Sequence, residues 1–140
     1  MNQPANQTEQ DARGDLDAES VDAFLEIAPD GAVTVYCGKV ELGTGLATAM
    51  AQIVAGELGV PVDRVRAVMG DTARTPDQGS TTGSKSVQVA GVTLRRAAAT
   101  ARRALLQRAA DRMEVAPADL VIEDDLVRPI DRSSAGIPLG

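Results

Sequence analysis

Five short runs of apolar and β-branched residues, each bounded by turn-forming residues, predict β-strands. Asp30-Gly31 lies between the first two runs and Asp124-Asp125 between the last two, so each pair has a connection short enough for a tight turn. The pattern therefore predicts two hairpins and one further strand. The expected strands lie at 24–27, 33–37, 65–69, 120–122 and 126–127.

Two longer stretches repeat apolar residues every three to four positions, which predicts amphipathic helices. The first runs from Leu46 to Leu58 and ends at Gly59, a residue that favours a helix C-terminus. The second follows Ser84 and continues to about Met113. Its expected buried stripe is Val87, Ala90, Leu94, Ala98, Ala101, Leu105 and Ala109. Its other face carries Arg95, Arg96, Arg102, Arg103 and Arg108, which we interpret as a solvated surface.

These elements predict an α+β fold in which a small sheet, made of a hairpin plus further strands, packs against two helices. Phe24 and Tyr36 are the only aromatic residues in the chain, so its core must consist of aliphatic side chains and alanine. Such a core buries little apolar area, and we expect the isolated chain to be marginally stable and to need a partner. Residues 1–20 contain five acidic residues and one arginine, which predicts a disordered acidic tail.

The composition argues against several classes of function. A formal net charge of −6 disfavours nucleic-acid binding through the arginine face. The absence of histidine excludes serine–histidine and cysteine–histidine catalysis and histidine-ligated metal sites. Cys37 is a single cysteine, which we interpret as a small buried residue. No apolar stretch reaches membrane-spanning length, so we expect a cytoplasmic protein without a membrane partner.

Two glycine-rich loops contain the candidate site, and each precedes a predicted helix. Free N–H groups at a helix N-terminus bind anions, glycine allows close approach of the backbone, and hydroxyl groups add donors. Two such loops in one small chain predict a large anionic cofactor. The candidate cofactor-binding residues are Gly43, Thr44, Gly45, Thr82, Gly83, Ser84 and Ser86.

Simpler interpretations of these loops are a known phosphate-binding pattern or an ordinary turn before a helix. A dinucleotide fingerprint fails in the first loop because Thr48 occupies the third glycine position, and a Walker loop fails because Lys39 precedes the glycines. A plain turn between a strand and a helix stays open for the first loop. The second loop, 79–86, has more donors than the end of one helix requires.

Both loops lie in motifs that resemble a known family. Residues 38–45, followed by 51–61 and Gly70-Asp71-Thr72, form one motif, and residues 75–86 form the other. In order and spacing they are similar to the molybdopterin-binding subunit of the xanthine dehydrogenase/aldehyde oxidase family, in the branch of the isoquinoline 1-oxidoreductase and nicotinate dehydrogenase large subunits. The resemblance covers about residues 21–130.

The resemblance implies that residues 21–140 are part of a larger molybdopterin-binding domain, as a split subunit or a truncated gene product. It implies a molybdenum hydroxylase, which inserts a water-derived oxygen into an N-heterocycle or an aldehyde. The implied cofactor is molybdopterin cytosine dinucleotide, contacted by the two loops. The implied partners are the remaining molybdopterin-binding chain and a subunit with iron–sulfur clusters.

Two departures from the family pattern matter. Thr44 stands where many members have glutamine, which is longer and hydrogen-bonds near the metal. The catalytic glutamate of the family lies in a region that this sequence does not contain, so no catalytic residue is assigned and we expect the isolated chain to be inactive. The alternative is a non-catalytic orphan or assembly domain that keeps the fold without the cofactor.

Overall fold

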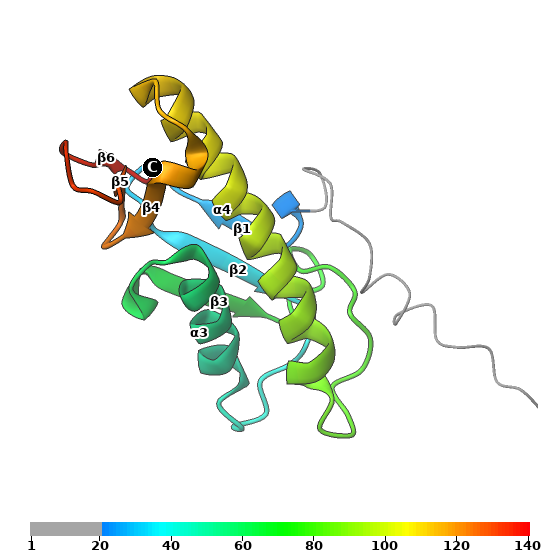
Figure 1. The fold of residues 1–140 in the computed structure, drawn as a ribbon. Coiled ribbons are helices and arrows are strands. Elements are labelled where there is room, and N and C mark those ends of the chain that lie inside the picture. The colour runs from blue at the N-terminus through cyan, green and yellow to red at the C-terminus, as the bar shows by residue number, and fades with distance from the viewer. Residues whose placement is uncertain (1–20) are drawn as a thin grey trace, which may run out of the picture.

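The computed structural model describes residues 21–140, and the tail predicted at 1–20 lies outside the described residues. It confirms the α+β class, with two helices and two small sheets (Figure 1). The elements, in chain order, are β1 (Leu25–Ile27), β2 (Val33–Cys37), α3 (Leu46–Leu58), a 3₁₀ turn (Val62–Arg64), β3 (Val65–Met69), a π-helical turn (Val87–Gly91), α4 (Val92–Met113), a 3₁₀ turn (Pro117–Asp119), β4 (Leu120–Glu123), β5 (Leu126–Pro129) and β6 (Ile137–Pro138).

The strands divide into two sheets, where the sequence suggested one. The first sheet has the order β1-β2-β3, with β1 antiparallel and β3 parallel to β2. The second sheet has the order β4-β5-β6 and is antiparallel. Both predicted hairpins are confirmed. They lie apart because α4 carries the chain along the first sheet before β4 begins, as Figure 1 shows.

The core lies between the first sheet and the two helices, which cover the same face of that sheet (Figure 1). Alternate residues of β2 point into it, and Cys37 is fully buried there, as predicted. The largest fully buried side chains are Met50, Leu58, Leu94, Val33, Val35, Val54 and Cys37. The prediction of a core without large aromatic rings is therefore confirmed, and the alanines of α4 allow the two helices to pack closely.

The beginning of the long helix differs from the prediction. Val87 is expected in the buried stripe, yet 47% of it is exposed. The first turn, Val87–Gly91, is π-helical, and its wider turn shifts the residues before Ala90 out of register with the buried face. Gly91 lies so close to α3 that a Cβ atom there would be 2.9 Å from the Ile53 side chain. The buried stripe therefore begins at Ala90.

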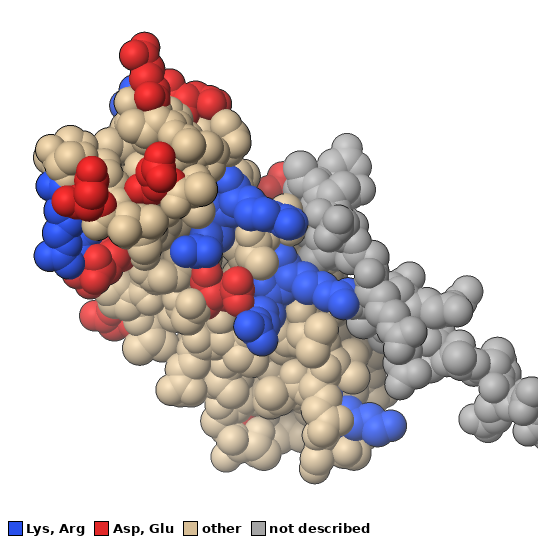
Figure 2. Space-filling model, viewed as in Figure 1, with Lys and Arg blue, Asp and Glu red and all other residues tan. Residues whose placement is uncertain are grey.

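The arginine face of α4 is largely solvated, as predicted. Arg95, Arg103 and Arg108 are exposed, whereas Arg96 and Arg102 are half-buried. Figure 2 shows charged side chains gathered over the end of the molecule that carries the second sheet and the C-terminal part of α4. Over residues 21–140, neither helix combines the length and the apolarity needed to cross a bilayer.

Candidate functional site

The two glycine-rich loops meet through residues 38–40 and 78–81, which we call the loop junction. Lys39 is its centre: this lysine is only 5% exposed, a degree of burial that lysine almost never reaches unless its ammonium group is paired. Its Nζ donates to the carbonyl oxygens of Gln78 at 2.6 Å, Gly79 at 3.3 Å and Ser80 at 2.8 Å. All three ammonium donors are thus used, and one buried charge holds the second loop against the first.

Two further hydrogen bonds cross the loop junction. The backbone N–H of Gly38 donates to Oε1 of Gln78 at 2.8 Å, and the N–H of Val40 donates to Oγ1 of Thr81, also at 2.8 Å. Gly38 is also tightly enclosed, because a Cβ atom there would lie 2.0 Å from the carbonyl oxygen of Pro76. The loops therefore have a fixed arrangement that depends on a glycine and a lysine.

Sequence reasoning missed Lys39, Gln78 and Thr81 as members of the site. In the sequence argument Lys39 appears in the Walker pattern, which it does not fit, and within the motif 38–45, without a role of its own. The available signal was the position of Lys39, a single cation just after a predicted strand in a stretch with few other charges. The aliphatic stem of a lysine is easily buried at such a position, and its ammonium group must then find acceptors. The signal did not indicate which acceptors these would be, since they are about forty positions away in the sequence.

The first loop is already occupied by a carboxylate of this chain. Glu41 Oε1 accepts from the N–H groups of Thr44 at 2.6 Å and Gly45 at 3.2 Å, and its Oε2 accepts from the N–H of Ala47 at 2.8 Å. These bonds, that of Ala47 foremost, hold the pKa of Glu41 below its ordinary value. The N-terminus of α3 is thus neutralised internally. Gly43 and Gly45 have left-handed backbones, with φ of +83° and +76°, and nothing lies within 4 Å of a Cβ built on either one.

Replacing Glu41 by glutamine should lower the free energy of unfolding at neutral pH, because an amide cannot offer both oxygens to the N–H groups of α3. The pKa of Glu41 is lowered in the folded chain, so the unfolded chain takes up the proton first as the pH falls. The stabilisation is therefore complete above the ordinary glutamate pKa and is lost as the pH falls through the lower pKa of the folded state.

Urea unfolding of the parent and Glu41→Gln chains, at about pH 7 and at about pH 2–3, measures this dependence. The two chains should differ at the higher pH and converge at the lower one. A difference of the same size at both pH values would show that the carboxylate charge does not stabilise α3.

The second loop, in contrast, leaves its donors open. Thr82, Gly83 and Ser84 are exposed, and Ser86 is half-buried. Among residues 21–140, none of the hydroxyl groups of Thr82, Ser84 and Ser86 has a hydrogen-bond partner, nor do the backbone N–H groups of Gly83 and Ser84. These open groups lie immediately before the π-helical turn that leads into α4.

The backbone of this loop is strained. Gly83 and Ser84 adopt left-handed conformations in succession, with φ of +63° and +53°. Such a conformation is unfavourable for a residue with a Cβ atom, and it persists where the surroundings hold it, often at a binding site. A Cβ atom on Gly83 would have open space, with the nearest atom, Cγ of Lys85, at 3.9 Å. Gly83 is therefore required for conformation or for a ligand, and not for packing inside this chain.

The structure brings both sets of predicted site residues to one end of the molecule, at the N-terminal ends of α3 and α4 (Figure 1). The visible surface of this end is largely uncharged (Figure 2). Three apolar residues of the same region are exposed: Val40 by 46%, Leu42 by 67% and Val87 by 47%. Within residues 21–140 there is no group of three or more carboxylate or thiol side chains that could hold a metal ion. This end is therefore suited to hold a polar ligand through N–H and hydroxyl donors.

Comparison with known proteins identifies the family of the chain. Residues 4–136 match the family model of the molybdopterin cofactor-binding domain. A nicotinate dehydrogenase subunit of Pseudomonas putida is 51% identical over 104 residues, which are 74% of this chain and 9% of that protein. The large chain of carbon monoxide dehydrogenase from Hydrogenophaga pseudoflava is 36% identical over 101 residues, which are 72% of this chain and 13% of that protein.

Solved structures show the same relationship. Quinoline 2-oxidoreductase from Pseudomonas putida 86 superimposes with a TM-score of 0.72 and 34% identity, over 82% of this chain and 14% of that chain. Carbon monoxide dehydrogenase from Oligotropha carboxidovorans gives a TM-score of 0.72 and 31% identity, over the same shares. This chain thus spans only a small part of the length of these relatives. The resemblance inferred from the two loop motifs is confirmed.

Proposed function

The chain belongs to the molybdopterin cofactor-binding domain family of the molybdenum hydroxylases, and on that premise we propose that its second loop binds the cofactor directly. This proposal depends on the hydrogen-bond donors of Thr82, Gly83, Ser84 and Ser86, which have no partner among residues 21–140. The backbone at Gly83 and Ser84 is left-handed, and packing within the chain does not explain the glycine there. N–H and hydroxyl groups of this kind complement phosphate and other oxygen-rich parts of a nucleotide-linked pterin.

The residues present fit such a cofactor in two different ways. The second loop has free hydrogen-bond donors and begins a helix, so it suits the anionic part. The first loop has its helix donors bound to Glu41, so Gly43, Thr44 and Gly45 suit close contact with an uncharged part of the cofactor. Lys39 acts as a positioning residue, because it fixes one loop relative to the other.

When bound, the cofactor supplies the molybdenum centre of a hydroxylase, and this chain supplies binding and orientation. We assign no proton transfer to the described residues. The resemblance supports cytosine dinucleotide as the cofactor form, a cytoplasmic location, and the remaining molybdopterin-binding chain and an iron–sulfur subunit as partners. The names of nicotinate dehydrogenase and quinoline 2-oxidoreductase support an N-heterocycle as substrate, with an aldehyde as the other candidate.

A second candidate function is a non-catalytic assembly domain that has the fold without the cofactor. The carboxylate of Glu41 favours it, because this group takes the N–H donors that the first loop would otherwise offer to an anion. Measuring the molybdenum bound to the assembled protein separates the two functions.

Replacing Gly83 by valine should reduce the molybdenum and cytosine nucleotide bound per assembled protein by more than about tenfold, since a β-branched residue resists φ of +63° and blocks close approach. Ser84→Ala should have a milder effect, the loss of one hydrogen bond to a charged group, about 1.5–3 kcal/mol. Gly83→Asn tolerates the left-handed backbone but adds a side chain, so it separates the effect of conformation from that of close approach.

Arg103→Ala is the matched control, because Arg103 is an exposed side chain on α4 away from the loop. Each variant is purified after co-expression with its partner chains, and metal and nucleotide are quantified. Molybdenum content in Gly83→Val equal to that of the parent would mean that the second loop only begins the helix and does not bind the cofactor. Absence of molybdenum from the assembled parent would favour the non-catalytic alternative.

A further inference from the structure

The outer edge of β1 has unused backbone hydrogen-bonding groups. Toward β2, the carbonyl oxygen of Phe24 accepts from the N–H of Tyr36, and the N–H of Ala28 donates to the carbonyl oxygen of Ala32, both at 2.8 Å. In an antiparallel pair only every second residue bonds to the partner strand, so Glu26 also points toward β2. The N–H and C=O groups of Leu25 and Ile27 therefore point away from the sheet. They have no partner among residues 21–140.

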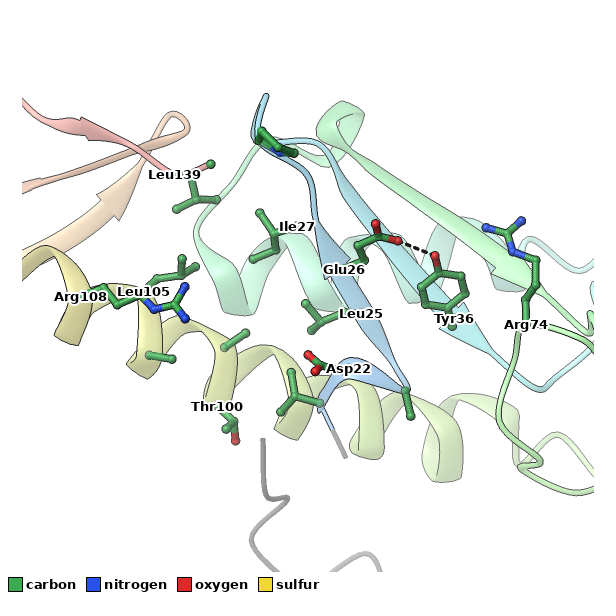
Figure 3. Close-up of a pocket in the computed structure, with 16 residues that line it drawn as sticks. Asp22, Leu25, Glu26, Ile27, Tyr36, Arg74, Thr100, Leu105, Arg108 and Leu139 are labelled. Atoms are coloured by element: carbon green, nitrogen blue, oxygen red, sulfur yellow. Dashed lines mark hydrogen bonds between the residues drawn. The ribbon is translucent and has the colours of Figure 1, made fainter. Parts of the chain in front are cut away.

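This free edge opens into a cavity of about 930 Å³. One wall is formed by α4: Ala101, Ala104 and Leu105 make most of it apolar, and the polar Thr100 and Arg108 of the same helix also line it. Figure 3 shows Leu25, Ile27, Leu105 and Leu139 on one side of β1. The cavity continues around the edge of β1, which is why it is lined by residues from both faces of the sheet.

The other wall is polar and fixed. The hydroxyl of Tyr36 donates to Oε2 of Glu26 at 2.7 Å, and the guanidinium of Arg74 lies over the Tyr36 ring, 5.4 Å from its centre. Figure 3 shows these three side chains together on the side of β1 opposite to Leu25 and Ile27. A strand laid along β1 would thus have a mainly apolar wall for one set of its alternating side chains and a polar wall for the other.

We propose that this groove is the docking site for an extended strand from the remaining part of the molybdenum-binding subunit, which would continue the first sheet beyond β1. The inference rests on the proposed function. An edge with free N–H and C=O groups, combined with pockets for alternating side chains, is the arrangement that recognises an extended peptide.

The occupant follows from the size of the relatives. This chain matches 9% of the length of one relative and 14% of the length of a solved one, so most of a complete subunit lies outside it. A domain whose core has only small and aliphatic side chains also gains from such an addition, because the new strand would cover the half-buried Ile27 and Leu105 and the exposed Ala104.

The test compares amide hydrogen exchange of the full chain alone and in complex. The probe is the 51% identical nicotinate dehydrogenase subunit of Pseudomonas putida, expressed without the segment that this chain matches and co-purified with this chain. The amides of Leu25 and Ile27 should become protected by more than about tenfold, since each gains a hydrogen bond. The amide of Glu26 should change little, because it already faces β2. This alternation within three residues distinguishes an added strand from general shielding.

A pair of variants tests the same contact without labelling. Ile27→Pro removes an outward N–H but leaves the bonds between β1 and β2, whereas Ile27→Ala removes the side chain and keeps the N–H. Ile27→Pro should retain at least about tenfold less of the probe than Ile27→Ala. Equal retention, absence of the complex, or no protection of Leu25 and Ile27 within it would overturn the proposal.

Two other results would each indicate a different occupant of the groove and would also overturn the proposal. Protection in the chain alone that rises with protein concentration would indicate a second copy of the chain. Protection in the chain alone that disappears on deletion of residues 1–20 would indicate that segment. Molybdenum content is measured on the same samples: strand protection without molybdenum counts against the proposed function only, and molybdenum without strand protection counts against the docking site only.

Discussion

Replacing Lys39 by methionine should separate the two loops and abolish retention of the cofactor in the assembled protein. Methionine fills a similar volume but offers no donor to the carbonyl oxygens of Gln78, Gly79 and Ser80. Hydrogen bonds to a charged group contribute about 1.5–3 kcal/mol each and are not additive, so we expect the free energy of unfolding to fall by about 2 kcal/mol or more. Urea unfolding and molybdenum content measure the two effects.

A local measurement distinguishes loop separation from general destabilisation. The amides of Gly38 and Val40, which donate to side chains of the second loop, should exchange faster in Lys39→Met, whereas amides in β2 should not. The control is Lys85→Met, since Lys85 is an exposed lysine of the second loop. If Lys39→Met kept the protection of Gly38 and Val40, the lysine would not be what holds the loops together.

Replacing Gly38 by alanine should disrupt the loop junction sterically. The added Cβ atom would lie 2.0 Å from the carbonyl oxygen of Pro76 and 2.9 Å from the backbone nitrogen of Gln78. Both are backbone atoms, which cannot move aside as a flexible side chain does, so the loop 70–83 must shift. Overpacking of this kind costs about 1–3 kcal/mol, and loss of the bond to Gln78 adds to it. Thermal unfolding and molybdenum content measure the result.

Gly56→Ala is the matched control for this glycine. Gly56 is an exposed residue in the middle of α3, and nothing lies within 4 Å of a Cβ atom built there. Alanine should therefore raise the free energy of unfolding by about 0.5–1 kcal/mol through its higher helix propensity. A Gly38→Ala chain as stable as the parent would mean that the loops can move apart freely.

Local patterns sufficed for most of the fold. Asp30-Gly31 predicted the first hairpin, and Gly31 there has a left-handed backbone. Gly59 predicted the end of α3, and its N–H donates to the carbonyl oxygen of Ala55, with φ of +82°. Each of these signals depends on neighbours within a few positions. Local rules did not predict the two separate sheets or the π-helical turn, because both depend on how α4 packs against elements distant in the sequence.

The candidate site was predictable only in part, for the same reason. That Gly83 and Ser84 stand open before a helix follows from their composition and position. That Glu41 reaches back to the N–H groups of Thr44, Gly45 and Ala47 requires the conformation of the turn. The role of Lys39 requires contacts about forty positions away, which one sequence does not specify.

The carboxylate of Glu41 has a consequence for how such a domain could be redesigned. The Glu41 carboxylate already balances the positive end of α3 within the chain. Substitutions in the first loop should therefore change the shape of a binding surface there without changing its preference for ligand charge. On the proposed function, discrimination between an anionic and a neutral ligand is left to residues 82–86. To make such a domain accept a ligand of different charge, one would therefore substitute those five positions and use the first loop to select for ligand size.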